Sequence, residues 1–132
     1  MAESEVEKSY GRCALNSKFI DRFYEIFLKS HPDIGPMFKN TDFVKQKVAL
    51  RSGVATMLML DSGKAMAKVT LDRIAATHSQ KGNLKIPHKL YPYWIDSLLA
   101  TVKECDPEFK PALELQWRSA LQKGVDYIIS HG

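Results

Sequence analysis

The chain lacks any long apolar run and has few of the residues that mark fibres, disulfide scaffolds or disordered segments. Its 132 residues include seven Gly, six Pro and two Cys. No apolar stretch approaches the roughly 18 residues that a membrane span needs. The two cysteines, Cys13 and Cys105, lie far apart and form no CxxC pair. We therefore expect a protein without a membrane span, whose two thiols stay reduced and packed.

Neither basic nor acidic residues form a long cluster in the sequence. Nineteen basic and fifteen acidic residues give a net charge of +4, and no run of basic residues exceeds two. A nucleic-acid-binding protein usually shows a basic stripe or an aromatic and basic platform, so nucleic acid is not expected as a partner. The N-terminus, Met1-Ala2-Glu3-Ser4-Glu5, is acidic and lacks the apolar core of a signal peptide. We expect a cytoplasmic protein that does not bind membranes.

Several common catalytic signatures are missing from the chain. It contains no phosphate-binding GxxxxGK[ST] motif, no dinucleotide-binding GxGxxG motif, no HExxH motif and no GxSxG motif. The sequence therefore does not support phosphate-cradle, zincin or α/β-hydrolase chemistry.

What the chain does have is helical periodicity along nearly its whole length. Apolar residues recur at intervals of three and four positions, and no long stretch alternates like a half-buried strand. The pattern predicts one all-α domain over residues 1–132, with six to eight helices and no linker.

The expected helix boundaries follow from capping and breaking residues. In chain order they are a helix from about Glu3 to Ala14, a helix capped by Ser17 and stopped by Pro32, a helix capped by Asp42 and interrupted at Asp61-Ser62-Gly63, a helix from about Lys68 to Gln80 ended by Lys81-Gly82-Asn83, a helix with Pro87 in its first turn, and a last helix opened by Asp106-Pro107-Glu108.

Three polar residues, Tyr24, Gln46 and His78, lie on apolar helix faces. Each taken singly is more often a packed tyrosine, a glutamine that reaches solvent, or a core histidine bonded to a carbonyl. Burying an imidazole among aliphatic residues costs free energy unless its nitrogens find partners. Together the three residues describe an apolar slot with a basic nitrogen on one wall and hydrogen-bond donors on another, which is what a haem protein needs.

The order and spacing of these residues resemble the bacterial single-domain globins and the globin domain of flavohaemoglobins. Tyr24 and Phe38 are 14 positions apart, and Gln46 and His78 are 32 positions apart. The resemblance runs from about Ser17 to the end of the chain. The motifs that carry it are Phe23-Tyr24, His31-Pro32, Pro36-Met37-Phe38, Thr41-Asp42, Gln46, Leu50, His78 followed by Gly82, Tyr91-Pro92 and Leu98-Leu99.

The resemblance implies a globin fold, in which helices form a three-over-three sandwich around haem b (iron protoporphyrin IX). It implies that His78 is the proximal iron ligand. Tyr24 and Gln46 match the distal pair, whose hydrogen-bond donors face a bound diatomic ligand. In the family, the iron ligand and the hydrogen-bond donors therefore lie on two different walls of the pocket.

The resemblance also implies the walls of the haem pocket. Phe38 matches the aromatic residue against the porphyrin, Leu50 the apolar residue over the iron, and Tyr91 the proximal tyrosine. The haem-pocket residues expected on this basis are Phe38, Phe43, Leu50, Val54, Leu71, Ile74, Ile86, Tyr91, Ile95 and Leu98.

The remaining three histidines are weaker candidates for the iron ligand. His31 precedes Pro32 at a helix end and His131 is near the terminus, so both are expected to face solvent. His88, next to Pro87 where a helix opens, is the rival ligand, although its surroundings suit a surface corner.

The function that the resemblance implies is oxygen binding, with nitric oxide, carbon monoxide and peroxide as further candidate ligands. Three alternatives stay open: a haem peroxidase or nitric-oxide dioxygenase with a separate reductase, a haem-based gas sensor with a partner protein, and a globin-fold module without haem. The last helix ends Ser130-His131-Gly132 and has no match for the carboxylate of the family's proximal His–Tyr–Glu network, which weakens the enzyme hypothesis. Lys47 stands beside Gln46 where a small residue would ease packing, which leaves open a register that turns Gln46 outward.

Overall fold

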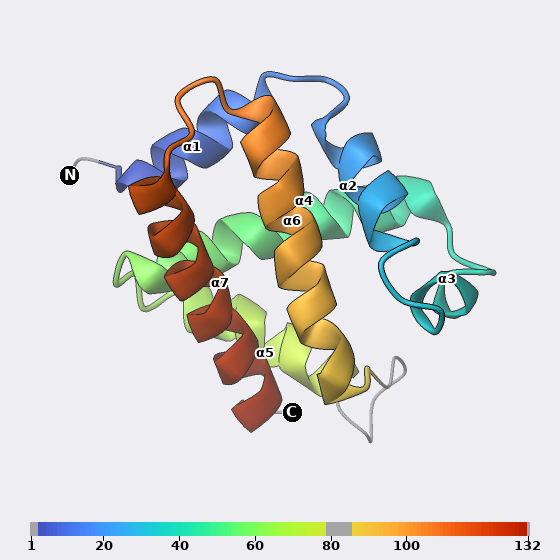
Figure 1. Cartoon of the computed structure of the whole chain (residues 1–132). Coiled ribbons are helices and arrows are strands. Elements are labelled where there is room, and N and C mark those ends of the chain that lie inside the picture. Colours follow the sequence, from blue (N-terminus) through green and yellow to red (C-terminus); the bar gives the residue numbers. More distant parts are fainter. Residues whose placement is uncertain (1–2, 79–85, 132) are drawn as a thin grey trace.

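The computed structural model describes residues 3–78 and 86–131. Within these residues the chain forms seven α-helices and one short 3₁₀ helix, and no strand (Figure 1). The elements are α1 (Glu5–Ala14), α2 (Phe19–Phe27), α3 (Ile34–Met37), α4 (Phe43–Asp61), α5 (Ala67–His78), η1 (His88–Leu90), α6 (Tyr91–Cys105) and α7 (Pro111–His131). The predicted all-α fold of six to eight helices is confirmed.

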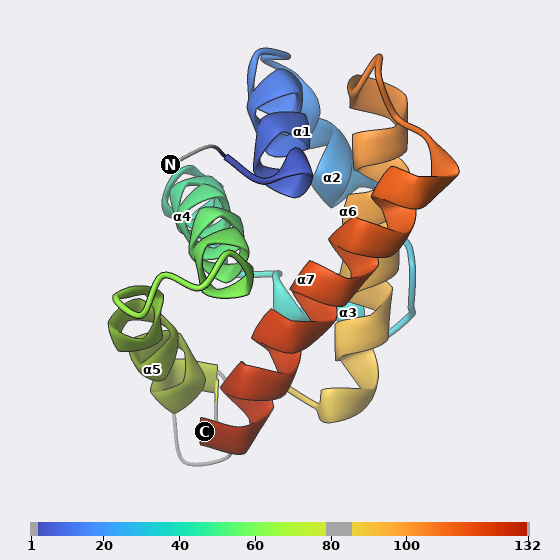
Figure 2. The same cartoon turned by 90° about the vertical axis from the view of Figure 1, so that its left-hand side faces the viewer.

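The six longer helices pack as two layers of three. Helices α1, α4 and α5 form one layer, in which α4 contacts both α1 and α5, while α2, α6 and α7 form the other, in which α6 contacts both α2 and α7. Between the layers, α1, α4 and α5 all pack on α7, and α1 also packs on α6. Figure 2 shows α4 and α5 on one side of the molecule and α6 and α7 on the other. This is the three-over-three arrangement that the resemblance implies.

Side chains cap the N-terminal ends of two helices. Ser4 Oγ accepts a hydrogen bond from the Glu7 amide at 3.1 Å, and Glu7 Oε1 accepts one from the Ser4 amide at 3.0 Å. This capping box makes α1 begin two residues later than predicted. The predicted cap of α4 is confirmed, because Asp42 Oδ1 accepts a hydrogen bond from the Val44 amide at 3.0 Å.

Two other predicted helix starts are wrong. Ser17 does not cap α2; the turn before that helix is closed by Asn16, whose Oδ1 accepts a hydrogen bond from the Lys18 amide at 2.9 Å. Pro87 precedes η1, and Pro92 is the proline in the first turn of α6. Serine and proline are common both in loops and at helix starts, so the sequence pattern alone could not show which of several neighbouring residues begins each helix.

The predicted interruption at Asp61-Ser62-Gly63 is confirmed. Gly63 adopts a φ of 86°, a left-handed conformation that glycine reaches without strain, and it ends α4. Helix α2 ends before Pro32 is reached. The predicted end of α5 at Gln80 and the turn at Lys81-Gly82-Asn83 lie outside the described residues.

A buried polar cluster joins α1 to the segment between α6 and α7. The Asp106 side chain is fully buried and accepts hydrogen bonds from Ser9 Oγ and Arg12 Nε, both at 2.6 Å. Its Oδ1 also accepts one from the Glu108 amide at 2.9 Å, and Trp117 Nε1 donates to Ser9 Oγ at 2.9 Å. The prediction that Asp106 opens the last helix is wrong: it ends α6 and anchors α1, and α7 begins five residues later.

We expect the Asp106 cluster to be a main source of acid sensitivity. Burial raises the pKa of the Asp106 carboxyl, but the hydrogen bonds from Arg12 and Ser9 outweigh burial and lower the pKa to about 2, against an ordinary value of 3.8. Because the folded-state pKa is lower, the stabilisation is complete above the ordinary value and is lost as the pH falls toward 2. Asp106→Ala should lower the free energy of unfolding at pH 7 by about 3 kcal/mol, since it removes the buried carboxylate that accepts hydrogen bonds from both Ser9 and Arg12.

Urea unfolding at pH 7 and at pH 3 measures both effects. The natural chain should lose stability between the two values, and Asp106→Ala should lose less. A variant as stable as the natural chain at pH 7 would contradict this assignment.

Candidate functional site

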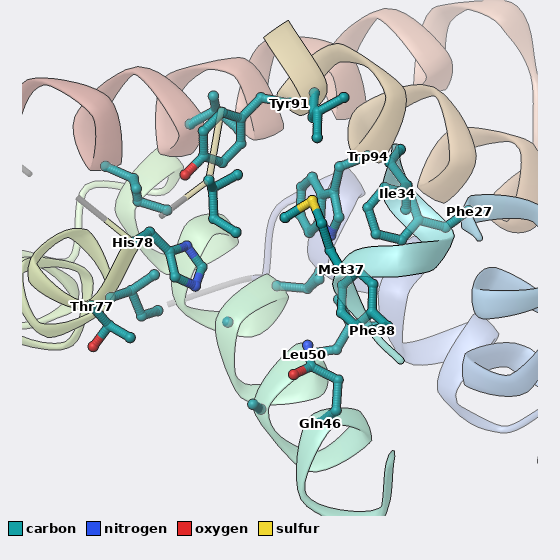
Figure 3. Close-up of a pocket in the computed structure, with 18 of the residues that line it drawn as sticks. Phe27, Ile34, Met37, Phe38, Gln46, Leu50, Thr77, His78, Tyr91 and Trp94 are labelled. Atoms are coloured by element: carbon teal, nitrogen blue, oxygen red, sulfur yellow. The ribbon is translucent and has the colours of Figure 1, made fainter. Parts of the chain in front are cut away.

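An apolar cavity of about 400 Å³ lies between α4, α5 and α6 (Figure 3). Elements distant in sequence supply its wall, from α2 near the start of the chain to α7 at the end. The predicted site residues that it brings together are Tyr24, Phe38, Gln46, Leu50, Val54, Ile74, His78, Ile86 and Tyr91.

Four residues predicted for the pocket lie outside this wall. Leu71, Ile95 and Leu98 are buried in the core behind it. Phe43 packs edge-on against Tyr24, with 5.3 Å between the ring centroids, and supports that ring from the side. The apolar face of a helix is broader than the strip that reaches a cavity, so periodicity alone places too many residues in the wall.

Other wall residues were missed by the sequence analysis. They are Phe27, Ile34, Met37, Thr41, Ala49, Gly53, Met57, Arg73, Thr77, Leu90, Trp94, Val125 and Ile128. Helical spacing could have found some of them, because Met57 lies seven positions after Leu50 and Trp94 lies three after Tyr91. Nothing local in the sequence indicates that α7 reaches the cavity.

His78, the last residue of α5, points its imidazole toward the space between α4 and α6 (Figure 3). Its Nδ1 is the one buried side-chain nitrogen or oxygen without a hydrogen-bond partner among the described residues. Burial lowers the pKa of the imidazole below its ordinary value of 6.5, so the ring is neutral at pH 7. A neutral, unpartnered imidazole on an apolar wall is suited to bind a metal.

A metal at His78 would need its other ligands from elsewhere. In residues 3–78 and 86–131 no group of three or more His, Cys, Asp or Glu side chains is placed to hold a metal ion. The site therefore suits a metal that is bound within a flat, apolar prosthetic group better than it suits a free metal ion.

Tyr24 and Gln46 place polar groups on a second wall. The Gln46 side chain extends along the cavity side of α4, one turn before Leu50 (Figure 3). The Tyr24 hydroxyl donates a hydrogen bond to the backbone carbonyl oxygen of Gln46 at 3.5 Å. Burial raises the pKa of Tyr24 to about 12, so the phenol keeps its proton. A hydrogen bond this long is readily exchanged for a shorter one to an acceptor in the cavity.

Lys47 does not turn Gln46 outward. Its Nζ lies 2.7 Å from Asp21 Oδ1, in a partly exposed ion pair between α4 and α2. Because successive helical residues point in different directions, Lys47 faces solvent while Gln46 lines the cavity.

Helices α6 and α7 supply aromatic and apolar surface. Tyr91 and Trp94 come from the first turns of α6, and burial raises the pKa of Tyr91 to about 12. The side chains that α7 contributes to the described wall are Val125 and Ile128. No α7 carboxylate therefore faces the cavity in the described part of the chain.

Comparison with known proteins shows the family. No model of a known protein family matches the chain, and no curated protein matches it. Among solved structures it matches a crystal structure from Pseudomonas aeruginosa, of a protein described as structurally highly homologous to a human hemoglobin. The TM-score is 0.89 and the sequences are 36% identical, over 96% of this chain and 94% of that chain. The chain belongs to the globin family. The resemblance to bacterial single-domain globins and the globin fold are both confirmed.

The other histidines of this globin do not line the described wall of the cavity. His88 is exposed in η1. His131 is exposed and stacks on Tyr127, with ring centroids 3.8 Å apart. His31 is partly buried against Tyr93, with 4.9 Å between the ring centroids, so the expectation that His31 faces solvent is met only in part.

Both cysteines of the globin are free, as expected. Cys13 is buried, and burial raises its pKa to about 12, which keeps the thiol protonated. No helix in the described residues of the globin is long and apolar enough to cross a membrane.

We expect His78→Leu to stabilise the globin when it is prepared without any cofactor. The variant removes a buried nitrogen that has no partner among the described residues, and such a group costs about 1–3 kcal/mol. Urea unfolding should show this gain. His88→Leu, at an exposed position, is the matched control and should change little. A loss of stability in His78→Leu would show that the imidazole is satisfied in solution.

Proposed function

We propose that residues 1–132 form one globin domain that holds haem b in the apolar cavity and binds oxygen reversibly there. The observation that carries the proposal is the neutral His78 imidazole, buried and unpartnered at Nδ1 among the described residues, on the wall of a cavity of about 400 Å³. The globin fold by itself supports haem binding. The buried His78 nitrogen that has no partner among the described residues supports the cavity beside it as the place where haem binds.

The residues around the cavity fit that group. His78 would bind the iron, and Leu50 and Val54 of α4 and Ile74 of α5 would provide apolar walls around the group. Phe38 would pack against the ring system. When bound, haem b supplies an iron atom with a coordination position for a diatomic gas.

The open side of the cavity suits the carboxylates of haem b. Arg73 and Thr77 are one turn apart on α5, both are exposed, and both line the cavity. In the described part of the chain Arg73 is the one charged side chain on this wall, and it forms no ion pair there. A guanidinium at the mouth would attract the two anionic propionates and orient them toward solvent.

Tyr24 and Gln46 would favour diatomic ligands that accept a hydrogen bond once they are bound. A protonated phenol and a side-chain amide each offer a donor on the same wall. Oxygen would gain most from these donors, and nitric oxide is the second ligand that we propose. The described wall contains no carboxylate that would make His78 more electron-donating, so a peroxidase or dioxygenase cycle with a separate reductase is not favoured.

We expect a Soret band when haemin is added to the protein. His78→Ala should abolish or strongly shift the band, because the variant lacks the proposed iron ligand. His88→Ala should bind haemin as the natural chain does, because His88 is exposed and away from the described wall. Absorption spectra of the ferric and ferrous forms measure this. Equal effects of the two substitutions would refute the ligand assignment.

We expect Tyr24→Phe and Gln46→Leu to speed oxygen release. Each variant removes one donor worth about 0.5–1.5 kcal/mol, or more toward a charged acceptor, so the release rate should rise from a few-fold to about a hundredfold. Stopped-flow measurement of the off-rate checks this. Val48→Ala, at an exposed position of α4, is the control and should leave the rate unchanged. Unchanged rates in both test variants would show that neither side chain contacts the ligand.

A further inference from the structure

Gly124 lies where α7 crosses α4 at very close range. A methyl group on Gly124 would lie 2.5 Å from Met57 Cγ, 2.9 Å from Sδ and 3.0 Å from Met57 Cβ. The last of these atoms is fixed to the α4 backbone, so rotating the Met57 side chain cannot relieve the whole clash. The absence of a side chain at position 124 is therefore what permits this crossing.

Met57 belongs to the cavity as well as to the helix crossing. It is buried and lines the cavity from α4, as do Leu50 and Val54 on the same helix face. On the α7 side, Val125 follows Gly124 directly and also lines the cavity. Met57 thus contacts Gly124 and also forms part of the cavity wall next to α7.

Among the glycines that the structure describes, Gly124 alone shows so close an approach. Gly53 also lines the cavity, but a methyl group there would meet Ile74 Cδ1 at 4.0 Å, an ordinary contact. A methyl group on Gly11 or Gly63 would meet nothing within 4 Å. Only at Gly124, among these positions, does a side chain compete with a cavity wall for space.

We propose that Gly124 sets the room available at the α7 end of the cavity by letting Met57 lie against the α7 backbone. A side chain at position 124 displaces Met57 into the cavity, because the surrounding core is close-packed and leaves the flexible Met57 side chain no other space. Gly124 is a positioning residue that acts through Met57. Its consequence for haem uptake rests on the proposed function, but its consequence for the size of the cavity does not.

The test compares Gly124→Ala, Met57→Ala and the double variant. Haemin titration followed by the Soret band should show Gly124→Ala weakening binding by about tenfold, and the double variant recovering most of the loss. Ser9→Ala lowers stability from the distant α1 cluster and should leave haemin binding unchanged. Gly11→Ala adds a methyl group to a helix at an open position, and should also leave it unchanged.

A second measurement tests the size of the cavity in the protein without haem. Xenon binds in apolar cavities, and its binding to the cofactor-free protein can be followed by xenon NMR. Gly124→Ala should reduce xenon binding and the double variant should restore it. The proposal is overturned if Gly124→Ala binds xenon as the natural chain does, or if Met57→Ala fails to rescue it. If the natural chain binds xenon but no haemin, the proposed function fails while the xenon series still decides the role of Gly124.

Discussion

The site depends on one unfavourable arrangement, a buried imidazole nitrogen without a partner among the described residues. Protein interiors rarely leave such a group unsatisfied, because desolvation without a new hydrogen bond costs free energy. In this chain the atom belongs to His78, and the space next to it is an apolar cavity of about 400 Å³. The surrounding helices can carry that cost because their packing is otherwise dense, from Trp117 in α7 to Leu98 in α6.

The layers of the fold explain how one cavity can collect such different side chains. Helices α4 and α5 both pack on α7, and the cavity occupies the space that they leave near α6. Each helix contributes what its own pattern provides: an amide and aliphatic residues from α4, an imidazole from α5, aromatic rings from α6. The chemistry is divided among walls, so no single segment carries the function.

Sequence patterns predicted the parts of the site that depend on local spacing. Gln46 and Leu50 are one helical turn apart, and His78 ends a helix whose Ile74 lines the same cavity. Patterns failed where the determinant was a contact between distant segments: Val125 reaches the cavity only because α7 crosses α4. The role of Asp106 was missed for the same reason, since its partners on α1 are more than ninety positions away.

The cluster around Asp106 also has a consequence for synthesis of the chain. Ser9 forms hydrogen bonds with Asp106 and Trp117, so α1 cannot complete its docking until both of these residues have left the ribosome. Contacts of such long sequence separation form late, because a large loop must close first. Helix α1 is thus synthesised long before the residues that anchor it, and a nascent chain that stops short of Asp106 leaves Ser9 and Arg12 without the carboxylate that later accepts their hydrogen bonds.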